Sequence, residues 1–349
     1  MAQKESIIEV EGRQIKLSNL DKVLYPKAGF TKGQVIDYYV RIAPVLLPHL
    51  ADRALTLKRY PNGVEGMFFY EKNCPSYRPS WMKTAKVWSE GNNRFMHYCV
   101  VADLPTLVWL GNLADLELHT SLSRAPETNR PTVIAFDLDP GAPANIVQCC
   151  QVGLWVREIF EQFGLQAFAK TSGSKGLQVY IPLNTTVTYE QTKPFAKAIA
   201  QLLEERHRDS VVSDMKKALR VNKVFVDWSQ NDDYKTTVNA YSLRAKDQPT
   251  VSTPVTWKEV ETCLKKGDPE LLVFTSDHVL QRVQKSGDLF EPVLKLKQKL
   301  PPLSALGNGV AQPASAPPTK VKRMQSPRPA RKTAAKTVSK PVKHKARAR

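Results

Sequence analysis

The chain has 349 residues, of which 42% are hydrophobic and 24% are charged, and its formal net charge is +18. This length suits one large domain or two ordinary ones, and the composition excludes a chain that is disordered over most of its length. We expect neither a membrane-spanning helix nor a secretory signal, because no run of eighteen apolar residues occurs and no apolar segment follows Met1-Ala-Gln-Lys-Glu5.

The first 130 residues mix short elements with many turn residues. We interpret them as an α/β region that packs on the rest of the fold. The sequence between about 131 and 300 is more regular, and we interpret it as the part that carries the chemistry.

This second part predicts a β-α-β-β-α-β order. The pattern indicates strands at 132–137, 165–170, 177–182 and 224–227, and helices at 144–163 and 189–207. Such an order is typical of the split βαβ of a ferredoxin-like (RRM-like) sheet. A further strand at 236–243 and two helices, at 257–265 and about 289–299, are expected to complete an α/β (α+β) fold.

The last segment, 301–349, is strongly basic. It holds 12 Lys and Arg and no Asp or Glu, which leaves +6 for residues 1–300. Because it is rich in Pro, Ala, Ser and Thr, we expect a disordered tail that binds a polyanion, with nucleic acid as the favoured target. A solubilising tail without a specific role is the alternative.

Cysteine usage indicates a reducing compartment. The five cysteines are odd in number, and none forms a C-x-x-C pair; they are Cys74, Cys99, Cys149, Cys150 and Cys263. We therefore expect neither a disulfide framework nor a zinc site, and a cytoplasmic protein.

Three aspartates are the candidate metal ligands. Asp137 and Asp139 lie two residues apart at the end of a strand, so both carboxylates face one side of the sheet. Asp227 ends the fourth strand, which neighbours the first in a ferredoxin-like sheet. Converging carboxylates need cations, and Mg²⁺ or Mn²⁺ prefer oxygen ligands; two such ions suit phosphoryl transfer. Taken alone, a D-x-D pair at a strand end also suits a cap or a turn.

A loop and several cations accompany these carboxylates. Ser172-Gly173-Ser174-Lys175-Gly176 combines small residues, which let backbone N–H groups approach a phosphate, with one ammonium group. It is not a Walker A loop, and its alternative is a flexible hairpin turn. Arg220, Lys223 and Arg244 flank the Asp227 strand and suit a metal-bound triphosphate, or else are ordinary solvated charges.

Four motifs together resemble the polymerase domain of bacterial DNA ligase D, in the archaeo-eukaryotic primase superfamily. In chain order they are Phe136-Asp-Leu-Asp-Pro-Gly141, Thr171-Ser-Gly-Ser-Lys-Gly-Leu177, Val224-Phe-Val-Asp-Trp-Ser-Gln-Asn231 and Tyr241-Ser-Leu-Arg-Ala245. The resemblance runs from about Ile15 to Leu300. It implies a primase-polymerase fold and a template-dependent nucleotidyltransferase of end joining and gap repair, which often prefers ribonucleotides and Mn²⁺.

The resemblance also implies roles for single residues. Asp137, Asp139 and Asp227 are similar to its metal ligands, and the nucleoside triphosphate is expected at Ser172, Lys175, Arg220, Arg244 and, more weakly, Gln230. His119 resembles a histidine beside the incoming sugar; a hydrogen-bonded structural histidine is the alternative.

DNA contacts are implied in the N-terminal part. Asn19, Lys22 and Lys32 match a pocket for the 5′-phosphate across a gap, and their alternative is surface charge. Phe69 and Tyr70 match an aromatic pair that stacks on template bases, and their alternative is core packing.

The chain departs from the family pattern at two points. Gln178 follows Ser-Gly-Ser-Lys-Gly-Leu where the family usually has His, and it can donate a hydrogen bond but carries no charge. No K-x-D-G ligase motif is found, so we expect a stand-alone polymerase that depends on a separate ligase. The resemblance also implies end-binding proteins of the Ku type as partners. We expect gapped, nicked or broken DNA and NTP or dNTP as ligands, and an association with the nucleoid.

Two other functions remain open from the sequence. Phe-Asp-Leu-Asp also mimics a haloacid-dehalogenase-like phosphatase, which has a parallel sheet and expects Thr or Val where this chain has Pro140-Gly141. A DNA-end binding protein with a vestigial site is the non-enzymatic alternative, which Gln178 and the basic tail permit.

Overall fold

The computed structural model describes residues 5–89 and 92–306. Contacts group Met1–Ala311 into one unit and Gln312–Arg349 into a second, which lies outside the described residues. The predicted basic tail therefore also lies outside them, apart from residues 301–306. Within the described ranges, no helix is long and apolar enough to cross a membrane.

The helices begin mostly at polar capping residues. Side chains of Thr31, Asp103, Asn145 and Thr256 each accept a hydrogen bond from a backbone N–H of the first turn, which satisfies a donor that has no partner within the helix. The described helices are α1 (Lys32–Leu50), α2 (Leu104–Asn112), α3 (Ile146–Gln162), α4 (Tyr189–Arg206), α5 (Trp257–Lys266), α6 (Ser276–Ser286) and α7 (Glu291–Lys295).

One six-stranded sheet, which we call the catalytic sheet because it carries the predicted metal ligands Asp137, Asp139 and Asp227, has the four predicted strands at its centre. Its order is β13-β14-β10-β12-β11-β16. The strands are β10 (Val133–Pro140), β11 (Phe168–Thr171), β12 (Leu177–Pro182), β13 (Val211–Val212), β14 (Val224–Asp227) and β16 (Pro254–Val255). The central order and antiparallel pairing of β14, β10, β12 and β11 confirm the split βαβ arrangement, and they exclude the parallel sheet of the phosphatase alternative.

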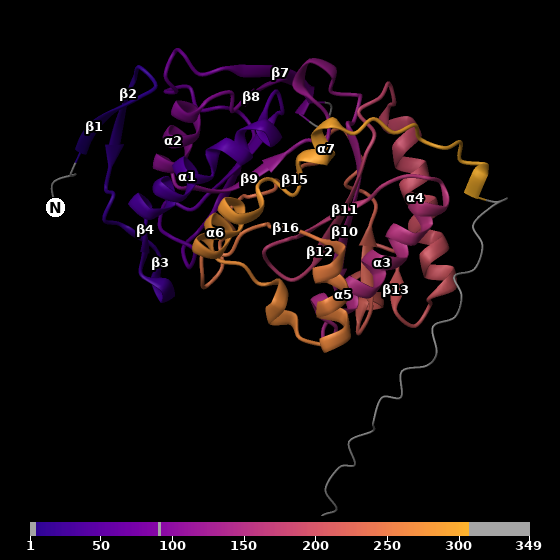
Figure 1. Ribbon diagram of the computed structural model, residues 1–349. Helices are drawn as coiled ribbons and strands as arrows, with labels where there is room; N and C mark the ends of the chain where they lie inside the picture. Colours follow the sequence, from indigo (N-terminus) through magenta and orange to yellow (C-terminus); the bar gives the residue numbers. More distant parts are fainter. Residues whose placement is uncertain (1–4, 90–91, 307–349) are drawn as a thin grey trace, which may run out of the picture. The chain divides into compact units, whose positions relative to one another are not determined.

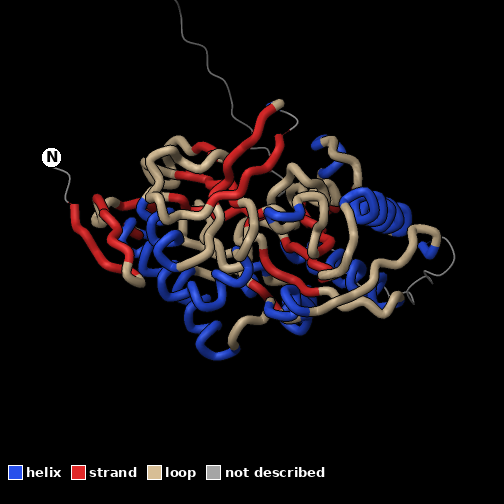
Figure 2. Tube along the Cα trace, turned by 90° about the horizontal axis from the view of Figure 1, so that it is seen from above, coloured by secondary structure: helices blue, strands red, loops and turns tan. Residues whose placement is uncertain are grey.

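A second sheet lies in the N-terminal part. Its order is β15-β9-β5-β8-β7, with β6 added beside β5. The strands are β5 (Leu55–Arg59), β6 (Phe69–Glu71), β7 (Thr84–Ser89), β8 (Arg94–Cys99), β9 (Asp115–Thr120) and β15 (Thr237–Val238). Two hairpins precede it, formed by β1 (Glu5–Val10) with β2 (Arg13–Ser18) and by β3 (Val23–Tyr25) with β4 (Phe30–Thr31). The paired strands β7 and β8 stand out from the body in Figure 2.

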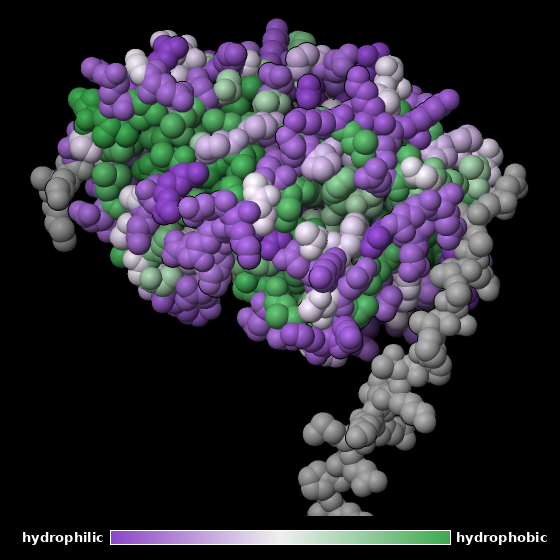
Figure 3. Space-filling view, in the orientation of Figure 1, coloured by the Kyte–Doolittle hydropathy of each residue, from purple (hydrophilic) through white to green (hydrophobic). Residues whose placement is uncertain are grey.

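Two hydrophobic cores form, and strands β10 and β12 contribute side chains to both. The α1 and α2 helices belong to the core of the N-terminal sheet, in which Tyr38 and Tyr39 are fully buried. The α3, α4 and α5 helices belong to the core of the catalytic sheet, where Phe160 packs between Phe136 and Phe195 at ring distances of 5.9 and 6.1 Å. Figure 1 shows α1 and α2 on one side of the described unit and α3 and α4 on the other. On the face drawn in Figure 3, apolar side chains gather mainly over the N-terminal part.

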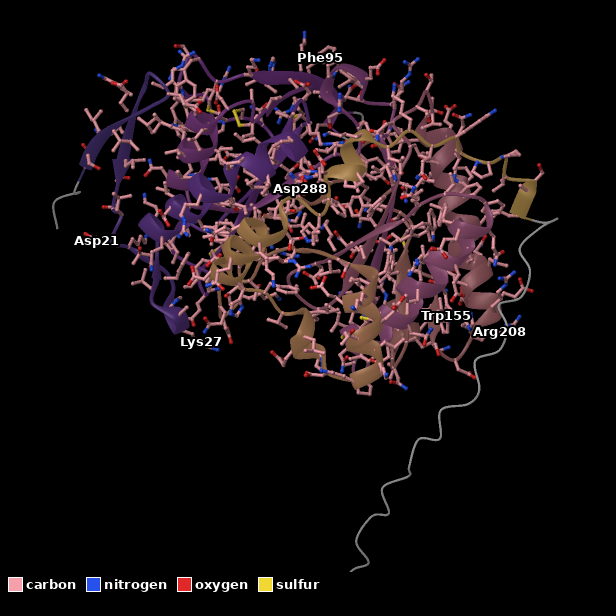
Figure 4. The ribbon with its side chains drawn as sticks, viewed as in Figure 1. Asp21, Lys27, Phe95, Trp155, Arg208 and Asp288 are labelled. Atoms are coloured by element: carbon pink, nitrogen blue, oxygen red, sulfur yellow. A yellow bond between two sulfur atoms is a disulfide. The ribbon has the colours of Figure 1, made fainter. Side chains whose placement is uncertain are left out.

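A buried polar cluster joins the two parts. The Asp288 carboxylate, which Figure 4 labels near the middle of the unit, accepts a hydrogen bond from the Tyr241 hydroxyl at 2.6 Å and lies 2.8 Å from His49 Nε2. His49 belongs to α1, whereas Asp288 lies between α6 and α7. The pairing therefore ties the C-terminal helices to the N-terminal part.

The structure corrects several expectations about secondary structure. Of the strand predicted at 236–243 only Thr237–Val238 forms, because the chain then turns through Tyr241 at a φ of 65°. Helix α6 was not predicted at all, and the helix expected at about 289–299 is reduced to Glu291–Lys295.

The prediction that the cysteines form no disulfide is wrong for one pair. Cys74 and Cys99 are joined by a disulfide, while Cys149, Cys150 and Cys263 are reduced and buried. The backbone explains the proximity, because the Cys74 N–H donates to the carbonyl of His97 on β8. Sequence spacing could not show this, since the pair is separated by 25 residues.

We predict that Asn231→Ala destabilises the catalytic sheet. The fully buried Asn231 side chain accepts from the Ala135 N–H at 3.0 Å and donates to the Ala135 carbonyl at 2.7 Å, which fixes the turn after β14 against β10. Leaving buried backbone groups without partners costs about 1–3 kcal/mol each, so the free energy of unfolding should fall by at least that amount. Urea denaturation measures it. Asn92→Ala, which removes only an exposed bond to Ser89, should change little.

Candidate active site

The three aspartates lie at one end of two paired strands. The register of β10 and β14 places Asp137 opposite Asp227, and Asp139 opposite Phe225. Asp137 and Asp139 line a cavity of about 540 Å³, whereas Asp227 does not belong to its lining. Strand alternation directs the two β10 carboxylates to the same side of the sheet.

Burial and mutual repulsion act on these carboxyl groups. Burial, then the neighbouring Asp139, raise the pKa of Asp137 to about 7, although a hydrogen bond with Gln178 opposes the rise. Burial and Asp227 also raise the pKa of Asp139, against the nearby cations Arg220, Arg244 and Lys175. Each carboxylate therefore feels the negative charge of the others, which a bound cation would relieve.

The oxygen atoms of the three carboxylates are the type of ligand that a hard divalent cation prefers. Among the described residues, however, no group of three His, Cys, Asp or Glu side chains is placed so that it could hold a metal ion. Asp137 Oδ1 is buried and has no hydrogen-bond partner in this part of the chain. Asp227 is held in place, since its Oδ1 accepts from the Ser229 N–H and hydroxyl and its Oδ2 accepts from Gln230 Nε2 at 2.9 Å. Carboxylate oxygens of this kind suit Mg²⁺ or Mn²⁺.

A lysine that the sequence analysis missed supports Asp137 through Gln178. Lys170, Gln178, Asp137 and Asp227 are successive register partners across β11, β12, β10 and β14. The fully buried Lys170 Nζ donates to Gln178 Oε1, to the Val238 carbonyl at 3.0 Å and to Ser252 Oγ at 2.7 Å.

These contacts orient the Gln178 amide. Burial lowers the pKa of Lys170 to about 7. Three acceptors nevertheless surround Nζ, and Ser252 Oγ already donates its own proton to the Thr171 carbonyl, so the site is built for an ammonium group with three N–H bonds. An ammonium group only donates, and the Gln178 oxygen must therefore face it. The amide NH₂ is thereby turned toward Asp137.

The Ser-Gly-Ser-Lys-Gly loop closes tightly on β10. Ser172 Oγ accepts from the backbone N–H groups of Ser174 and Gly176 at 3.2 and 3.1 Å, so two donors expected to face a phosphate are bonded within the loop. A Cβ atom at Gly176 would lie 2.1 Å from the Leu138 carbonyl oxygen, which explains glycine there. Lys175 lines the cavity together with Ser172 and Ser174.

The two predicted arginines differ in position. Arg244 lines the cavity, and its guanidinium donates to the Ser172 carbonyl. Arg220 does not belong to the lining: its guanidinium lies 3.7 Å from the centre of the Phe225 ring and donates to the Met215 carbonyl at 2.7 Å. Gln230 lines the cavity as well as bonding Asp227.

His119 lines the same cavity. Its Nε2 lies 3.0 Å from Glu117 Oε2, and its ring makes an edge contact with Tyr70 at 6.1 Å. The sequence analysis missed Glu117 as a functional residue. Its signal was the alternation of Asp115, Glu117 and His119 along a strand, since charged residues on one face of a buried strand need partners.

The aromatic pair is exposed, so the alternative of core packing is wrong. Phe69 and Tyr70 are 43% and 58% exposed on β6. Their partners on β5 are cations: Arg59 lies 5.1 Å from the Phe69 ring centre and Lys58 5.6 Å from that of Tyr70.

Asn19, Lys22 and Lys32, which are predicted to bind a 5′-phosphate, lie where the 19–22 turn meets the start of α1. The Lys32 N–H donates to the Lys22 carbonyl at 2.8 Å, and the Lys22 N–H donates to the Asn19 carbonyl at 3.0 Å. Lys32 Nζ is bonded to Asn112 at 3.0 Å, and burial together with Lys22 lowers the pKa of Lys32 to about 8. The two ammonium groups are thus close enough to repel each other.

We predict that Asp137→Asn stabilises the cation-free protein. The pKa of Asp137, raised to about 7 from an ordinary 3.8, makes its charged form costly above pH 7, and the cost disappears as the pH falls from 7 toward 4. The gain in unfolding free energy should be of the order of 1–3 kcal/mol at pH 8 and vanish near pH 4. Urea denaturation with chelator present measures it. Asp37→Asn, at an exposed ion pair with Arg41, is the control; equal gains at both pH values would contradict the account.

Known proteins match most of this chain. The family model described as "LigD, primase-polymerase domain" matches residues 31–290. The "Multifunctional non-homologous end joining protein LigD" of Mycolicibacterium smegmatis is 40% identical over 282 residues, which are 80% of this chain and 36% of that protein. The "Bifunctional non-homologous end joining protein LigD" of Bacillus subtilis is 31% identical over 294 residues, covering 84% of this chain and 46% of that protein.

A solved structure has the same fold. The "Polymerase Domain from Mycobacterium tuberculosis Ligase D in complex with DNA" superposes with a TM-score of 0.75 at 40% identity, covering 80% of this chain and 98% of that domain. This confirms the predicted primase-polymerase fold, although the chain spans less than half the length of the curated relatives it matches. On the extent of the family match, the chain belongs to the LigD primase-polymerase domain family.

Proposed function

We propose that this chain is a template-dependent nucleotidyltransferase of DNA end joining, which adds nucleotides to primer 3′ ends at short gaps and broken ends. The observation that carries the proposal is that Asp137 and Asp139 line one and the same cavity as Lys175, Arg244 and His119. Membership of the family supports the reaction class. The relatives are named for non-homologous end joining, and the related polymerase domain was solved with DNA.

The cavity suits a nucleoside triphosphate. Its anionic phosphates would lie by the cations Lys175 and Arg244 and its sugar by His119, since all three side chains line the cavity. Asp137, Asp139 and Asp227 would hold two divalent ions, Mn²⁺ or Mg²⁺. When bound, such ions supply activation of the primer hydroxyl and neutralise charge on the transferred phosphate.

The chemistry is one displacement at phosphorus. The primer 3′-oxygen bonds to the α-phosphorus, the bond between this phosphorus and the α–β bridging oxygen breaks, and pyrophosphate leaves with that electron pair. The hydroxyl proton passes to solvent. Lys175 and Arg244 stabilise the leaving pyrophosphate, and Tyr70 and Phe69 offer faces on which template bases stack. Ribonucleotide use, a separate ligase and a Ku-like partner stay predictions from the family resemblance.

We predict that Asp227→Ala abolishes nucleotide addition while DNA binding survives. Losing this carboxylate disturbs cation placement opposite Asp137, whereas duplex affinity depends mainly on Lys and Arg elsewhere. Primer extension and a DNA-binding titration measure the two effects, with Asp137→Ala/Asp139→Ala as a second inactive variant and Asp37→Ala as an exposed control. Near-normal primer extension by Asp227→Ala with Mn²⁺ would contradict the assignment of the three aspartates as metal ligands. A wild-type chain that binds DNA ends without extending them would support the end-binding alternative.

We predict that recognition of a 5′-phosphate across a gap depends on Lys22 and Lys32 and weakens at high pH. Lys32 must be protonated to attract the phosphate, and its pKa of about 8 means that the charge is lost as the pH rises through that value. Because the bound dianion favours the charged form, the observed midpoint should lie above 8.

Affinities for 5′-phosphorylated and 5′-hydroxyl gapped DNA between pH 6.5 and 9.5 measure this. The ratio should be largest near pH 7 and should approach one in Lys22→Ala/Lys32→Ala, with most non-specific affinity retained. Lys16→Ala, at an exposed ion pair with Glu5, is the matched control. A double variant that keeps the phosphate preference would show that the pocket lies elsewhere.

A further inference from the structure

Glu117 is a buried carboxylate at which several elements meet. It lies on strand β9, between β15 and β5, and it is 1% exposed. Its Oε1 accepts from the Ala245 N–H at 3.0 Å and from the Tyr60 hydroxyl at 3.4 Å. Its Oε2 lies 3.0 Å from His119 Nε2, 3.2 Å from Lys58 Nζ and 3.3 Å from Arg244 Nε.

So many donors identify Glu117 as an ionised carboxylate. The hydrogen bond from His119 and the charges of Arg244 and Lys58 outweigh burial and hold the pKa of Glu117 well below its usual range. The contact to Arg244 is an ion pair rather than a hydrogen bond, because Arg244 Nε finds no hydrogen-bond partner within the described ranges. Removing the carboxylate would leave two cations without their buried counter-charge.

An ionised carboxylate accepts hydrogen bonds and donates none, which determines the His119 tautomer. The nitrogen that faces it, Nε2, must carry the hydrogen. Burial, with the neighbouring Arg244 and Lys58, lowers the pKa of His119 and outweighs Glu117, which raises it. The ring is therefore neutral at neutral pH, and Nδ1 presents a lone pair. No second hydrogen bond to this ring is found from the described side chains.

Strand pairing on both sides fixes the position of the His119 backbone. His119 is paired on one side with Thr56 of β5 and on the other with Val238 of β15. Thr56 and Val238 line the same cavity as His119, Asp137 and Asp139. Any group that meets the lone pair of Nδ1 must approach from a ligand in this cavity or from solvent.

Glu117 also contacts the segment that carries Arg244. Its contacts to the Ala245 N–H and to Arg244 Nε fix both the backbone and the side chain of the segment that carries Arg244. The Arg244 guanidinium in turn donates to the Ser172 carbonyl of the Ser-Gly-Ser-Lys-Gly loop. One carboxylate on the N-terminal sheet is thus connected to a loop of the catalytic sheet.

We propose that Glu117 is a positioning residue that sets sugar selectivity: it holds His119 with Nδ1 as a hydrogen-bond acceptor for a ribose hydroxyl, and it anchors Arg244 beside the triphosphate loop. This rests on the proposed function of the cavity. A hydrogen-bond acceptor favours binding of a ligand that has a donor, and the ribose 2′-hydroxyl is a donor that deoxyribose lacks. The same carboxylate would thereby tune both the sugar and the phosphate contacts.

The first test is spectroscopic and needs no turnover. Nitrogen-15 NMR of the wild-type histidine rings, with His119→Ala to assign the signal, should show His119 neutral and protonated at Nε2 at pH 7.5. A ring protonated at Nδ1, or at both nitrogens, overturns the proposal. This result is independent of whether the chain extends primers.

The second test compares ATP and dATP binding by calorimetry with Mn²⁺ present. Glu117→Gln should weaken both through Arg244 and lower the ratio of ATP to dATP affinity by about two- to tenfold, the range for one hydrogen bond. In the His119→Ala background, Glu117→Gln should lower this ratio no further. Asp115→Asn is the matched control, because Asp115 is an equally buried carboxyl on β9 that bonds the Lys58 N–H instead of His119; it should leave the ratio unchanged.

Two outcomes overturn the assignment: an unchanged ratio in a folded Glu117→Gln protein, or an equal fall with and without His119. Circular dichroism confirms folding of each variant. If the chain binds both nucleotides but extends no primer, the proposed polymerase activity is disproved. The ratio of ATP to dATP affinity and the NMR signal of the His119 ring still decide the role of Glu117.

Discussion

Repulsion among three carboxylates is the constraint around which this part of the chain is arranged. The pairing of β10 with β14 sets Asp137 opposite Asp227, and Asp139 follows on the same side of the sheet. Buried like charges raise each other's pKa and cost stability unless positive charge is near. The fold supplies that charge from several directions, through Lys175 and Arg244 at the cavity and through Lys170 across the sheet. These cations do not fully compensate the negative charge of the three carboxylates. The site is therefore suited to bound cations and to an anionic substrate.

The row of residues across the catalytic sheet explains how Gln178, which carries no charge, supports a buried carboxylate. Gln178 lies between Lys170 and Asp137 in register, and the ammonium group of Lys170 turns the amide so that its NH₂ faces the aspartate. A neutral side chain thereby provides a directed donor to a buried carboxylate. The Gln178 amide thus has hydrogen-bond partners on both sides, as a buried polar network requires.

The short strand β15 joins the two sheets at the cavity. Val238 pairs with His119 on the N-terminal sheet, while its carbonyl accepts from Lys170 of the catalytic sheet. Glu117 adds a second connection through Arg244 to the Ser172 carbonyl. His119 and the Ser-Gly-Ser-Lys-Gly loop therefore belong to different sheets but are connected by these contacts, so a displacement of one sheet would affect both.

The sequence by itself determined the order of the central strands and helices and the motifs at their ends. Apolar periodicity and turn residues mark β12 and β14 at their observed limits, and Asp137 and Asp139 alternate on one strand whatever the fold. Local patterns end there, because side-chain partners distant in sequence depend on how the sheets pack. Tertiary structure alone decided that Thr237–Val238 joins the other sheet, that Cys74 meets Cys99, that Arg220 rests on Phe225, and that Glu117 and Lys170 are buried at the cavity. A buried charge looks in sequence like a solvated one, since only its neighbours in space decide whether it is paired.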